Sequence, residues 1–560
     1  MASSFQSPFP LPGVQHGQRI LTSVIEARAK ADNTPPWVSV PINDQDLSQG
    51  FRDISFKELN NAANHAAHWL KQNLPPTSEP FQCFAYAGPK DLRYQILAVA
   101  AAKVQRVMVL PSPLVTPEAQ LHILEKKGCT VYLRPSSMEA PVAEILKAAP
   151  HVQTVTVPDI EAFMQEAEAE PVNYSKTYEE GRADPWLVFH TSGTTGTSPP
   201  IHNQDSIPTL PGNPKPVTYT HEMMAGADIV ASLSDIGETQ IHHYAQRRCY
   251  TPLPSLHFVG MALSLSMTTF IHMTAVIGPP SPPTPSTIIS LLHYGNVTTA
   301  MFPPSLIDAL TLTPEGLSAL RSLQYIQYAG APLSPKTASL LLPHVPIFPA
   351  VGSTEAGGYF TELHPHRTDA WDYLTFNKHT GVAFEPRGDG QLHELVFIRD
   401  PSCALQPIFK LYPDLSRFET KDLWEEHPIH KGLWKIIGRV DDYVYLSHGD
   451  GINVALLEPE IVAHPGVKNA LIGGHGRAKP VLLVEAVEDV EDEGKRREFV
   501  ESLRPYLDRV NERCHECVRL GLERVVVARR EKPFVMTGKG SVARWRTLEM
   551  YEGEIEEVCG

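Results

Sequence analysis

The sequence predicts an α/β protein with a large N-terminal domain and a small α+β domain after it. Across the first half of the chain, short apolar runs alternate with segments of helical spacing, which is typical of βα units on a largely parallel sheet. The 560 residues are too many for one hydrophobic core. After residue 440 the composition changes, and strand-like runs with one charged helix follow each other closely.

The individual elements follow from periodicity. Apolar residues recur at helical spacing over 54–73. The same reasoning predicts further helices over 20–31, 96–104, 117–127, 261–270 and 493–511. Short apolar runs predict strands over 83–88, 107–110, 130–133, 186–189, 325–329, 347–351, 469–473, 481–486 and 522–528.

Bulk composition argues against several classes of partner. The net charge is −15 and no long basic run occurs, so neither nucleic acid nor an anionic membrane is expected as a partner. No apolar run approaches the roughly 20 residues of a membrane helix, and no secretory signal is visible. The seven scattered cysteines indicate reduced thiols. We therefore expect a cytoplasmic protein that acts as a monomer.

The strand 186–189 enters a loop of small and hydroxyl-bearing residues. Glycines let a backbone approach a ligand closely, and the hydroxyls and N–H groups of such a loop can surround phosphate oxygens. No Gly-Lys-Ser/Thr follows, so this is not a Walker loop. The alternative is a flexible linker, but linkers rarely follow a buried strand directly. The candidate ligands are His190, Thr191, Ser192, Gly193, Thr194, Thr195 and Gly196.

The order of residues 190–196 resembles the phosphate-loop signature of the adenylate-forming superfamily, which includes acyl-CoA synthetases, luciferases and nonribosomal peptide synthetase (NRPS) adenylation domains. Further matches follow in the family's order, and the chain looks most like the adenylation domain of fungal NRPS-like carboxylic acid reductases. The resemblance implies an N-terminal adenylation domain with parallel-sheet and β-barrel-like subdomains (1–438), a hinge (439–442) and a small mobile C-terminal domain (443–560).

One departure follows the loop directly. The family's signature continues almost at once into Pro-Lys, whereas here Thr197 to Asn213 intervenes before Pro214 and Lys215. This stretch is rich in Pro, Ser, Asn and Asp, and a long surface loop adds little closure entropy. We therefore interpret it as a surface insertion and Lys215 as the motif lysine.

Three segments are implied to line the substrate and the adenine. The run 252–260 resembles a motif in which an aromatic or His residue lines the acyl pocket, and His257 stands there. The alternative is an ordinary histidine. Met301 and Phe302 end a strand that flanks the carboxylate substrate in the family. By the same resemblance, the segment Ala329, Gly330, Ala331 borders the adenine and the acyl group.

The run Gly352-Ser353-Thr354-Glu355 contains a carboxylate, which the expected reaction needs as a ligand for the metal ion that accompanies ATP. ATP arrives with Mg²⁺, a hard cation that prefers oxygen ligands. Glu355 is the predicted magnesium ligand, and Thr354 is suited to hydrogen-bond a phosphate. The family often has an aromatic residue before this glycine, stacked on adenine. Val351 stands there, and Tyr328 is the nearest substitute.

Residues 418–424 resemble the family's Thr-Gly-Asp motif, with Lys421 in place of Gly. A carboxylate accepts both ribose hydroxyl protons, so Asp422 is the predicted ribose ligand. Residues 434–442 resemble the hinge motif. There Arg439 offers a fixed positive fork to ribose or phosphate oxygens, and Asp441 is the predicted pivot.

Two segments of the C-terminal domain are implied to enter the site in turn. Residues 447–454 resemble the loop that lines the pantetheine tunnel, and 534–544 resemble the last core motif. Lys539 is the predicted catalytic lysine, which bridges carboxylate and phosphate oxygens, although the commoner pattern places lysine at Ser541. One CxxC, at Cys514 and Cys517, is a weak signal for zinc because no second pair accompanies it.

The resemblance implies that a carboxylic acid, with an aryl acid favoured, reacts with ATP and Mg²⁺ to give an acyl-adenylate and pyrophosphate. The acyl group would then pass to the phosphopantetheine thiol of a carrier domain, with carrier and reductase domains expected outside this chain. One alternative is a free-standing acyl- or aryl-CoA ligase. Another is a non-catalytic adenylation-like binding module, because Val351, Lys421 and Ser541 all depart from the common pattern.

Overall fold

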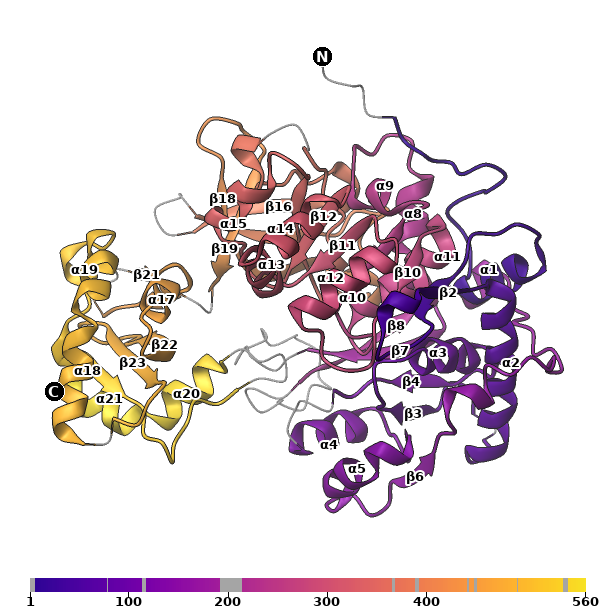
Figure 1. The fold of residues 1–560 in the computed structure, drawn as a ribbon, viewed down its shortest axis with the longest axis horizontal. Coiled ribbons are helices and arrows are strands. Elements are labelled where there is room, and N and C mark those ends of the chain that lie inside the picture. The colour runs from indigo at the N-terminus through magenta and orange to yellow at the C-terminus, as the bar shows by residue number, and fades with distance from the viewer. Residues whose placement is uncertain are drawn as a thin grey trace.

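The computed structural model describes residues 6–77, 79–112, 117–191, 214–364, 368–387, 392–440, 443–447, 451–490, 492–536 and 542–559. Figure 1 shows a large N-terminal part, built on sheets flanked by helices, and a smaller C-terminal part made of α17–α21 and β20–β24. The largely parallel sheets described below confirm the predicted α/β class.

The first large sheet has six strands in the order β6-β5-β3-β4-β7-β8. All neighbours are parallel except β8, which runs antiparallel to β7. Helix α2 begins after a capping box in which Ser55 and Glu58 satisfy each other's backbone N–H groups, and it buries its apolar side. The strands are β3 (Cys83–Tyr86), β4 (Val107–Val109), β5 (Val131–Arg134), β6 (Gln153–Thr156), β7 (Pro185–His190) and β8 (Pro216–Thr220), and the helices of this region include α2 (Phe56–Asn73), α3 (Arg93–Lys103), α4 (Pro117–Lys126) and α5 (Glu139–Leu146).

The second large sheet has seven strands in the order β13-β12-β11-β9-β10-β1-β2. Its neighbours are parallel except for the edge strand β2, which is antiparallel to β1. Proline stands in the first turn of α12 to α15, where its missing N–H costs nothing. The elements are β1 (Val38–Pro41), β2 (Phe51–Ile54), β9 (Arg248–Tyr250), β10 (Thr274–Val276), β11 (Thr299–Phe302), β12 (Tyr325–Ala329), β13 (Ile347–Ala350), α1 (Leu21–Lys30), α8 (Gly226–Ser232), α9 (Gln240–Tyr244), α10 (Phe258–Met261), α11 (Met267–Ile271), α12 (Pro285–Tyr294), α13 (Pro304–Thr311), α14 (Pro314–Arg321) and α15 (Pro335–Leu341).

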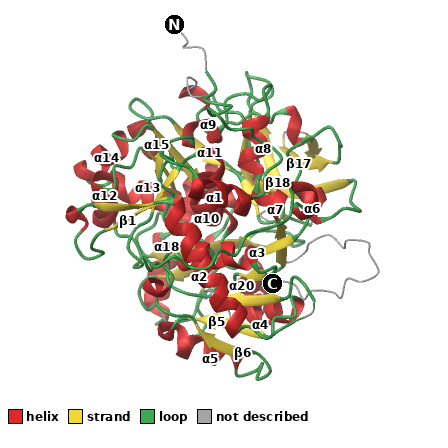
Figure 2. Ribbon diagram, turned by 90° about the vertical axis from the view of Figure 1, so that its right-hand side faces the viewer, coloured by secondary structure: helices red, strands yellow, loops and turns green. Residues whose placement is uncertain are grey.

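The third sheet is antiparallel and stands where a barrel-like subdomain is expected. Its strands β16 (Val382–Arg387), β17 (Leu392–Ile398), β18 (Arg417–Glu426) and β19 (Trp434–Arg439) pair in chain order. Among the described residues it is an open four-stranded sheet, extended beyond β19 by a bridge between Leu374 and Trp434. Figure 2 shows β17 and β18 on one side of the N-terminal part and α12–α15 on the other.

The C-terminal part is mixed α and β. Here β22 (Val467–Gly473) pairs antiparallel with β23 (Val481–Ala486), and β23 pairs parallel with β24 (Val525–Val527). The single helix expected over 493–511 is two helices, α18 (Glu493–Ser502) and α19 (Arg504–Glu512). The break falls at Leu503 because Pro505 cannot donate to the preceding turn and instead stands in the first turn of α19. The remaining elements are β20 (Tyr443–Tyr445), β21 (Gly451–Asn453), α17 (Val454–Val462), α20 (Arg544–Met550) and α21 (Glu552–Cys559).

The hydrophobic core is divided along the chain. The two largest clusters of buried side chains lie between Leu21 and Trp424, and two others lie wholly between Val444 and Ile555.

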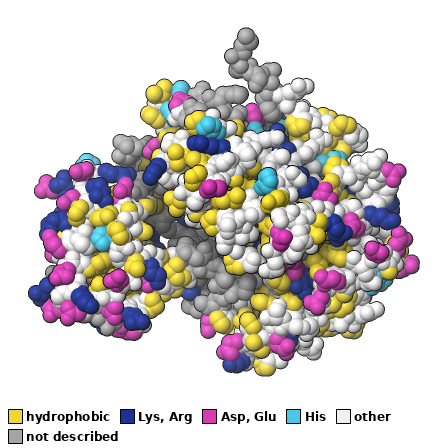
Figure 3. Space-filling model, in the orientation of Figure 1, with side chains coloured by type: hydrophobic (Ala, Val, Ile, Leu, Met, Phe, Trp, Pro, Cys, Tyr) yellow, Lys and Arg dark blue, Asp and Glu magenta, His cyan; other side chains and the backbone are white. Residues whose placement is uncertain are grey.

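On the face seen in Figure 3, basic and acidic side chains are closely mixed over the C-terminal part. No helix of the described residues has both the length and the apolar character that crossing a membrane requires.

Candidate active site

The predicted phosphate loop leaves the sheet from a closed hairpin. His190, the last residue of β7, stands opposite Pro216 of β8. The Thr191 N–H donates to the Lys215 carbonyl over 3.0 Å, and the Lys215 N–H donates to Thr191 Oγ1 over 2.9 Å. In the sequence, the loop and the insertion therefore stand between two residues, Thr191 and Lys215, that are hydrogen-bonded to each other. Outside the described residues lie Ser192, Gly193, Thr194, Thr195, Gly196 and the insertion 197–213.

The imidazole of His190 is buried and has a defined tautomer. Its Nε2 lies 3.0 Å from the backbone N of Ser112, which can only donate, so Nε2 is an acceptor. The proton is therefore on Nδ1, which donates to the Thr191 carbonyl over 2.8 Å. In this uncharged form His190 ties the start of the loop to the segment that follows β4.

Thr354 and Glu355 occupy the tip of a small hairpin between β14 (Gly352–Ser353) and β15 (Gly357–Gly358). The hairpin requires glycine at Gly352, where a Cβ would lie 2.4 Å from the Gly357 carbonyl oxygen, and at Gly357, whose φ is +68°. The Tyr219 hydroxyl donates to the Thr354 carbonyl over 2.8 Å. Because Tyr219 belongs to β8, it joins this tip to the strand that returns from the predicted phosphate loop.

Lys215 and Glu355 lie within electrostatic range of each other. Burial lowers the pKa of Lys215, and the Glu355 carboxylate opposes that shift. The Lys215 ammonium sits 4.5 Å from the ring centroid of Tyr412, the residue after α16 (Ile408–Leu411). Burial, and then Glu355, raises the pKa of Tyr412. A cation, a carboxylate and a phenol therefore gather beside the base of the predicted loop.

Asp422 is a buried carboxylate at the middle of β18. It pairs in register with Arg439 at the end of β19, and the Arg439 guanidinium lies 3.5 Å from Asp422 Oδ1. The Tyr359 hydroxyl donates to Asp422 Oδ2 over 3.4 Å. Burial raises the pKa of Asp422 to about 6, and the charge of Arg439 opposes the shift. Arg439 Nε is buried without a hydrogen-bond partner, so this guanidinium keeps an unused donor.

The predicted adenine segment lies at the carboxyl ends of two parallel strands. Ala329 ends β12 and stands opposite Ala350 of β13, which Val351 follows. Gly330 has φ +95°, and nothing lies within 4 Å of the Cβ position. Ala331, like Gly330, is exposed, and ligands of open α/β sheets bind at this edge. The proposed substitute for stacking, Tyr328, is 4% exposed and packs in the second core cluster, so its ring is already covered by core side chains.

The candidate acyl-pocket residues are only partly brought together. His257 precedes α10, and the neighbouring Phe258 ring packs 4.9 Å from the ring of Tyr219. This contact brings the start of α10, which His257 precedes, to the tyrosine that holds the Thr354–Glu355 tip. Met301 and Phe302 alternate on β11 and belong to different core clusters, so one strand face cannot present both to a single pocket. Phe302 is 0% exposed.

The residues present fit a magnesium ion held mainly by substrate. Glu355 is half-buried and offers carboxylate oxygens, the ligand type that Mg²⁺ prefers. Mg²⁺ commonly takes one or two carboxylates and completes its shell with phosphates and water. Within the described ranges no group of three or more His, Cys, Asp or Glu side chains could hold a metal by itself.

Several residues that shape this region have no signal in the sequence motifs. Apart from those motifs, the alternation of apolar and polar residues over 216–220 is typical of a half-buried strand that carries Tyr219, but it does not indicate the partner of the hydroxyl. Tyr359 and Tyr412 follow no recognisable pattern. Lys90 also lies outside every predicted motif. Its ammonium donates to the carbonyls of Thr251 and Pro252, at the start of the segment that carries His257. Burial lowers the pKa of Lys90 to about 8.

The C-terminal site predictions lie outside the described residues. These are the pivot Asp441, the loop around Gly449, and Lys539. The structure places Arg439 next to Asp422, but the roles given to Asp441 and Lys539 stay predictions. The same holds for the part that each described residue plays in ligand binding.

Comparison with known families gives two matches that follow one another along the chain. The family described as AMP-binding enzyme matches residues 28–198 and 211–383, and the AMP-binding enzyme C-terminal domain matches 441–559. The gap between the first two ranges falls inside the predicted insertion.

Curated relatives match most of this chain but are much longer. A carboxylic acid reductase of Neurospora crassa is 28% identical over 553 residues, which are 97% of this chain and 51% of the relative. An adenylate-forming reductase of Serpula lacrymans var. lacrymans is 24% identical and covers 99% of this chain and 50% of its own. The chain therefore spans about half the length of these relatives.

Solved structures share the fold over nearly the whole chain. An anthranilate CoA ligase in complex with anthranoyl-AMP superposes with a TM-score of 0.66 at 15% identity, covering 95% of this chain and 97% of that one. An o-succinylbenzoate coenzyme A synthetase of Bacillus subtilis, in complex with ATP and magnesium, gives 0.65 at 17% identity over 94% and 98%.

Proposed function

This chain belongs to the AMP-binding enzyme family, and from that premise we propose that it activates a carboxylic acid with ATP to give an acyl-adenylate and pyrophosphate. One observation supports this most directly. Two phenols link three motifs that are far apart in sequence: Tyr219 joins the phosphate-loop hairpin to the Thr354–Glu355 tip, and Tyr359, which follows that tip, contacts Asp422 beside Arg439. Phosphate, metal and ribose groups of one nucleotide need such a row of donors and acceptors.

The main physical problem of the reaction is the approach of two anions. A substrate carboxylate must reach the α-phosphate of ATP, and positive groups placed where charge develops lower that barrier. Lys215 supplies one cation at the base of the loop, and Lys539 would supply a second from the C-terminal part. Thr354 would hydrogen-bond a phosphate. A Mg²⁺ ion held by Glu355 would neutralise phosphate charge when bound.

Asp422 and Arg439, at the other end of this row of donors and acceptors, would orient the nucleotide. The ionised Asp422 would accept hydrogen bonds from both ribose hydroxyls, and Arg439, whose Nε has no hydrogen-bond partner in the structure, would donate to a further oxygen of the ribose or phosphate. Holding the ribose at one end and the phosphates at the other aligns the α-phosphorus for attack, which converts a bimolecular step into an effectively unimolecular one.

The acyl group would then pass to the phosphopantetheine thiol of a carrier domain, as the adenylation part of an NRPS-like carboxylic acid reductase. Supporting this proposal, the reductase relatives match this chain over 97% or more of its length and extend well beyond it. Carrier and reductase domains of the full-length protein would be its partners. Aryl acids are the first substrate class to test.

The experiment is a pyrophosphate-release screen over aryl, aliphatic and amino acids, run with ATP and Mg²⁺. We expect release that depends on one class of acid and falls at least a hundredfold in Glu355→Gln. The matched control is Glu315→Gln, an exposed carboxylate in the first turn of α14. Absence of acid-dependent release across the whole panel would contradict the proposal and favour a binding module.

A second arm separates the acyl acceptors. The acyl-adenylate formed by the enzyme is offered either coenzyme A or the phosphopantetheinylated carrier domain of the full-length protein, and thioester is measured by mass spectrometry. Acylation of the carrier, with coenzyme A at least a hundredfold slower, is the expected result. The reverse order would identify a free-standing CoA ligase.

A further inference from the structure

Lys421 adopts a backbone conformation that lysine rarely takes. Its φ is +61°, in the left-handed region that favours glycine. A non-glycine residue stays there only when its surroundings hold it. Lys421 immediately precedes Asp422, the proposed ribose ligand, so whatever holds Lys421 also sets the direction of the Asp422 side chain.

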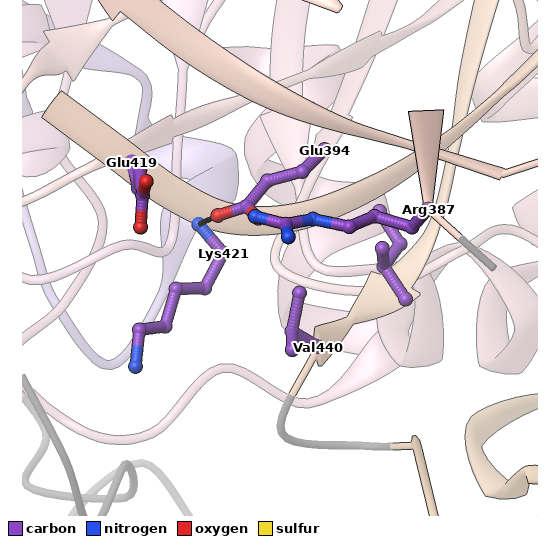
Figure 4. Close-up of a pocket in the computed structure, with 6 residues that line it drawn as sticks. Arg387, Glu394, Glu419, Lys421 and Val440 are labelled. Atoms are coloured by element: carbon purple, nitrogen blue, oxygen red, sulfur yellow. Dashed lines mark hydrogen bonds and ion pairs between the residues drawn. The ribbon is translucent and has the colours of Figure 1, made fainter. Parts of the chain in front are cut away.

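The holding group is the carboxylate of Glu394 on the neighbouring strand β17. Glu394 Oε1 accepts the Lys421 backbone N–H over 3.1 Å, and Glu394 is only 2% exposed. Its other oxygen is ion-paired with Arg387. Figure 4 shows the guanidinium beside the carboxylate and the dashed bond from Glu394 to the Lys421 backbone, while the Lys421 side chain extends away from Glu394. These groups line a cleft of about 210 Å³ with Glu419, Leu423 and Val440.

The pairing of the two strands shows why a holding group is needed. Glu394 pairs with Leu423, and Val396 pairs with Glu419, so three residues of β18 face the single residue Leu395 of β17. Such a bulge re-aims side chains and leaves backbone groups without ladder partners. Thr420 Oγ1 satisfies two of these groups, because it donates to the Leu395 carbonyl over 2.8 Å and accepts the Asp422 N–H over 3.1 Å. Glu394 satisfies the third.

We infer that Glu394 is a positioning residue for nucleotide binding: its buried carboxylate fixes the left-handed turn at Lys421, and so aims Asp422 at the ribose beside Arg439. The inference rests on the proposed function, since it assumes that Asp422 contacts the nucleotide. Glu394 itself would not touch ATP. Its removal should therefore weaken nucleotide binding while the affinity for the carboxylic acid stays the same.

The test compares Glu394→Ala with the double variant Glu394→Ala/Lys421→Gly. Without the carboxylate, lysine should leave the left-handed region, and we expect the KM for ATP and the Kd for AMP to rise about tenfold. The KM for the acid should change less than twofold. Glycine adopts positive φ without the steric cost, so the double variant should recover most of the lost AMP affinity. A purely structural role would not be rescued by glycine at another position.

The matched control is Glu385→Ala. Glu385 stands directly opposite Glu394 on β16, but its carboxylate pairs with Arg417 at the surface. We expect its ATP and AMP affinities to equal those of the wild type. Should Glu394→Ala fail to fold, Glu394→Gln replaces it, because its amide oxygen can still accept the Lys421 N–H and AMP affinity should fall less than threefold.

The outcomes separate the two proposals. AMP affinity in Glu394→Ala within twofold of the wild type, or no rescue in the double variant, would overturn the positioning role while leaving adenylation intact. A more than tenfold loss in Glu394→Gln would also overturn it, since charge and not the hydrogen bond would then be the requirement. If the folded wild type binds neither ATP nor AMP by calorimetry, the proposed function itself fails.

Discussion

The hydroxyl of Tyr359 lies 3.4 Å from Oδ2 of Asp422, a hydrogen bond between residues 63 positions apart. Replacing Tyr359 with Phe removes this bond but keeps the ring that packs against Phe397. We expect the KM for ATP to rise about threefold to tenfold, as loss of one hydrogen bond implies. The KM is measured from pyrophosphate release at saturating acid.

A second tyrosine provides the control for this variant. The Tyr373 hydroxyl donates to the exposed Glu425 over 3.0 Å on the same sheet, away from Asp422. Tyr373→Phe should leave the KM for ATP unchanged. An equal rise in both variants would show that the effect comes from the sheet as a whole and not from Asp422.

The raised pKa of Asp422 predicts a pH dependence of nucleotide affinity. Burial moves this pKa from 3.8 to about 6. The ionised form is the one that accepts ribose hydroxyls, so AMP affinity should fall as the pH drops below about 6. Because the AMP phosphate also titrates at about pH 6, Asp422→Asn should reduce this dependence to the part that the phosphate contributes, and it should lower the affinity at pH 8 by about tenfold or more. Calorimetry with AMP from pH 5 to pH 8 is the measurement, and a pH-independent wild type would contradict the assignment.

The raised pKa of Asp422 also predicts how the free energy of unfolding changes with pH. Because the folded state binds the Asp422 proton more tightly than the unfolded chain does, its contribution favours folding at low pH. That contribution is lost as the pH rises from about 4 to about 6. In Asp422→Asn this part of the pH profile of the free energy of unfolding should be absent.

The hairpin at Thr191 and Lys215 predicts that the insertion 197–213 can be removed. The two ends of the excursion are hydrogen-bonded to each other, so a short Gly-containing loop can close the gap with little entropic cost. We expect the KM for ATP to stay within twofold. Loss of ATP binding in a folded variant would show that the insertion belongs to the phosphate site.

Lys539 is expected to act in only one half-reaction. Lys539→Ala should lower acyl-adenylate formation by at least a hundredfold, because a cation at the transferring phosphoryl group is lost. Thiol acylation from a preformed adenylate should be largely intact. Both rates are measured on one preparation, and adenylation within a few-fold of wild type would rule out this assignment.

Asp441 is expected to absorb a rotation between the two reactions. Proline fixes φ near −65° and removes an N–H, so Asp441→Pro should restrict that rotation. We expect thioester formation to slow far more than adenylate formation. Equal losses in both steps would indicate misfolding or a static cleft instead of a hinge.

Sequence periodicity predicts secondary structure well where the residues of a segment determine its conformation by themselves. Apolar spacing predicted the helix 54–73, and α2 runs from Phe56 to Asn73 because the capping box at Ser55 starts it. The helix over 493–511 was wrong at its centre, since the apolar pattern continues across Leu503 while Pro505 interrupts the backbone hydrogen bonds.

In the candidate site, the sequence predicts individual residues of the motifs but not the contacts that connect one motif with another. Motif order pointed to Thr354, Asp422 and Arg439, and the structure brings Asp422 and Arg439 together. The contacts of the phenols that connect these motifs are not predictable from the sequence, because the Tyr219 hydroxyl bonds to a residue 135 positions away. At Lys421 the sequence showed a departure from glycine, and only the backbone angle shows that lysine has kept the conformation that glycine would take.

The separate cores of the two parts of the chain have a thermodynamic consequence. Side chains buried between Val444 and Ile555 form clusters of their own, so the C-terminal part can melt as its own cooperative unit. Calorimetry should then resolve two transitions, and a single melting temperature would not describe the protein. A substitution such as Leu482→Ala, in the C-terminal core, should shift one transition and leave the other in place. Nucleotide, if it bridges both parts, should merge the two.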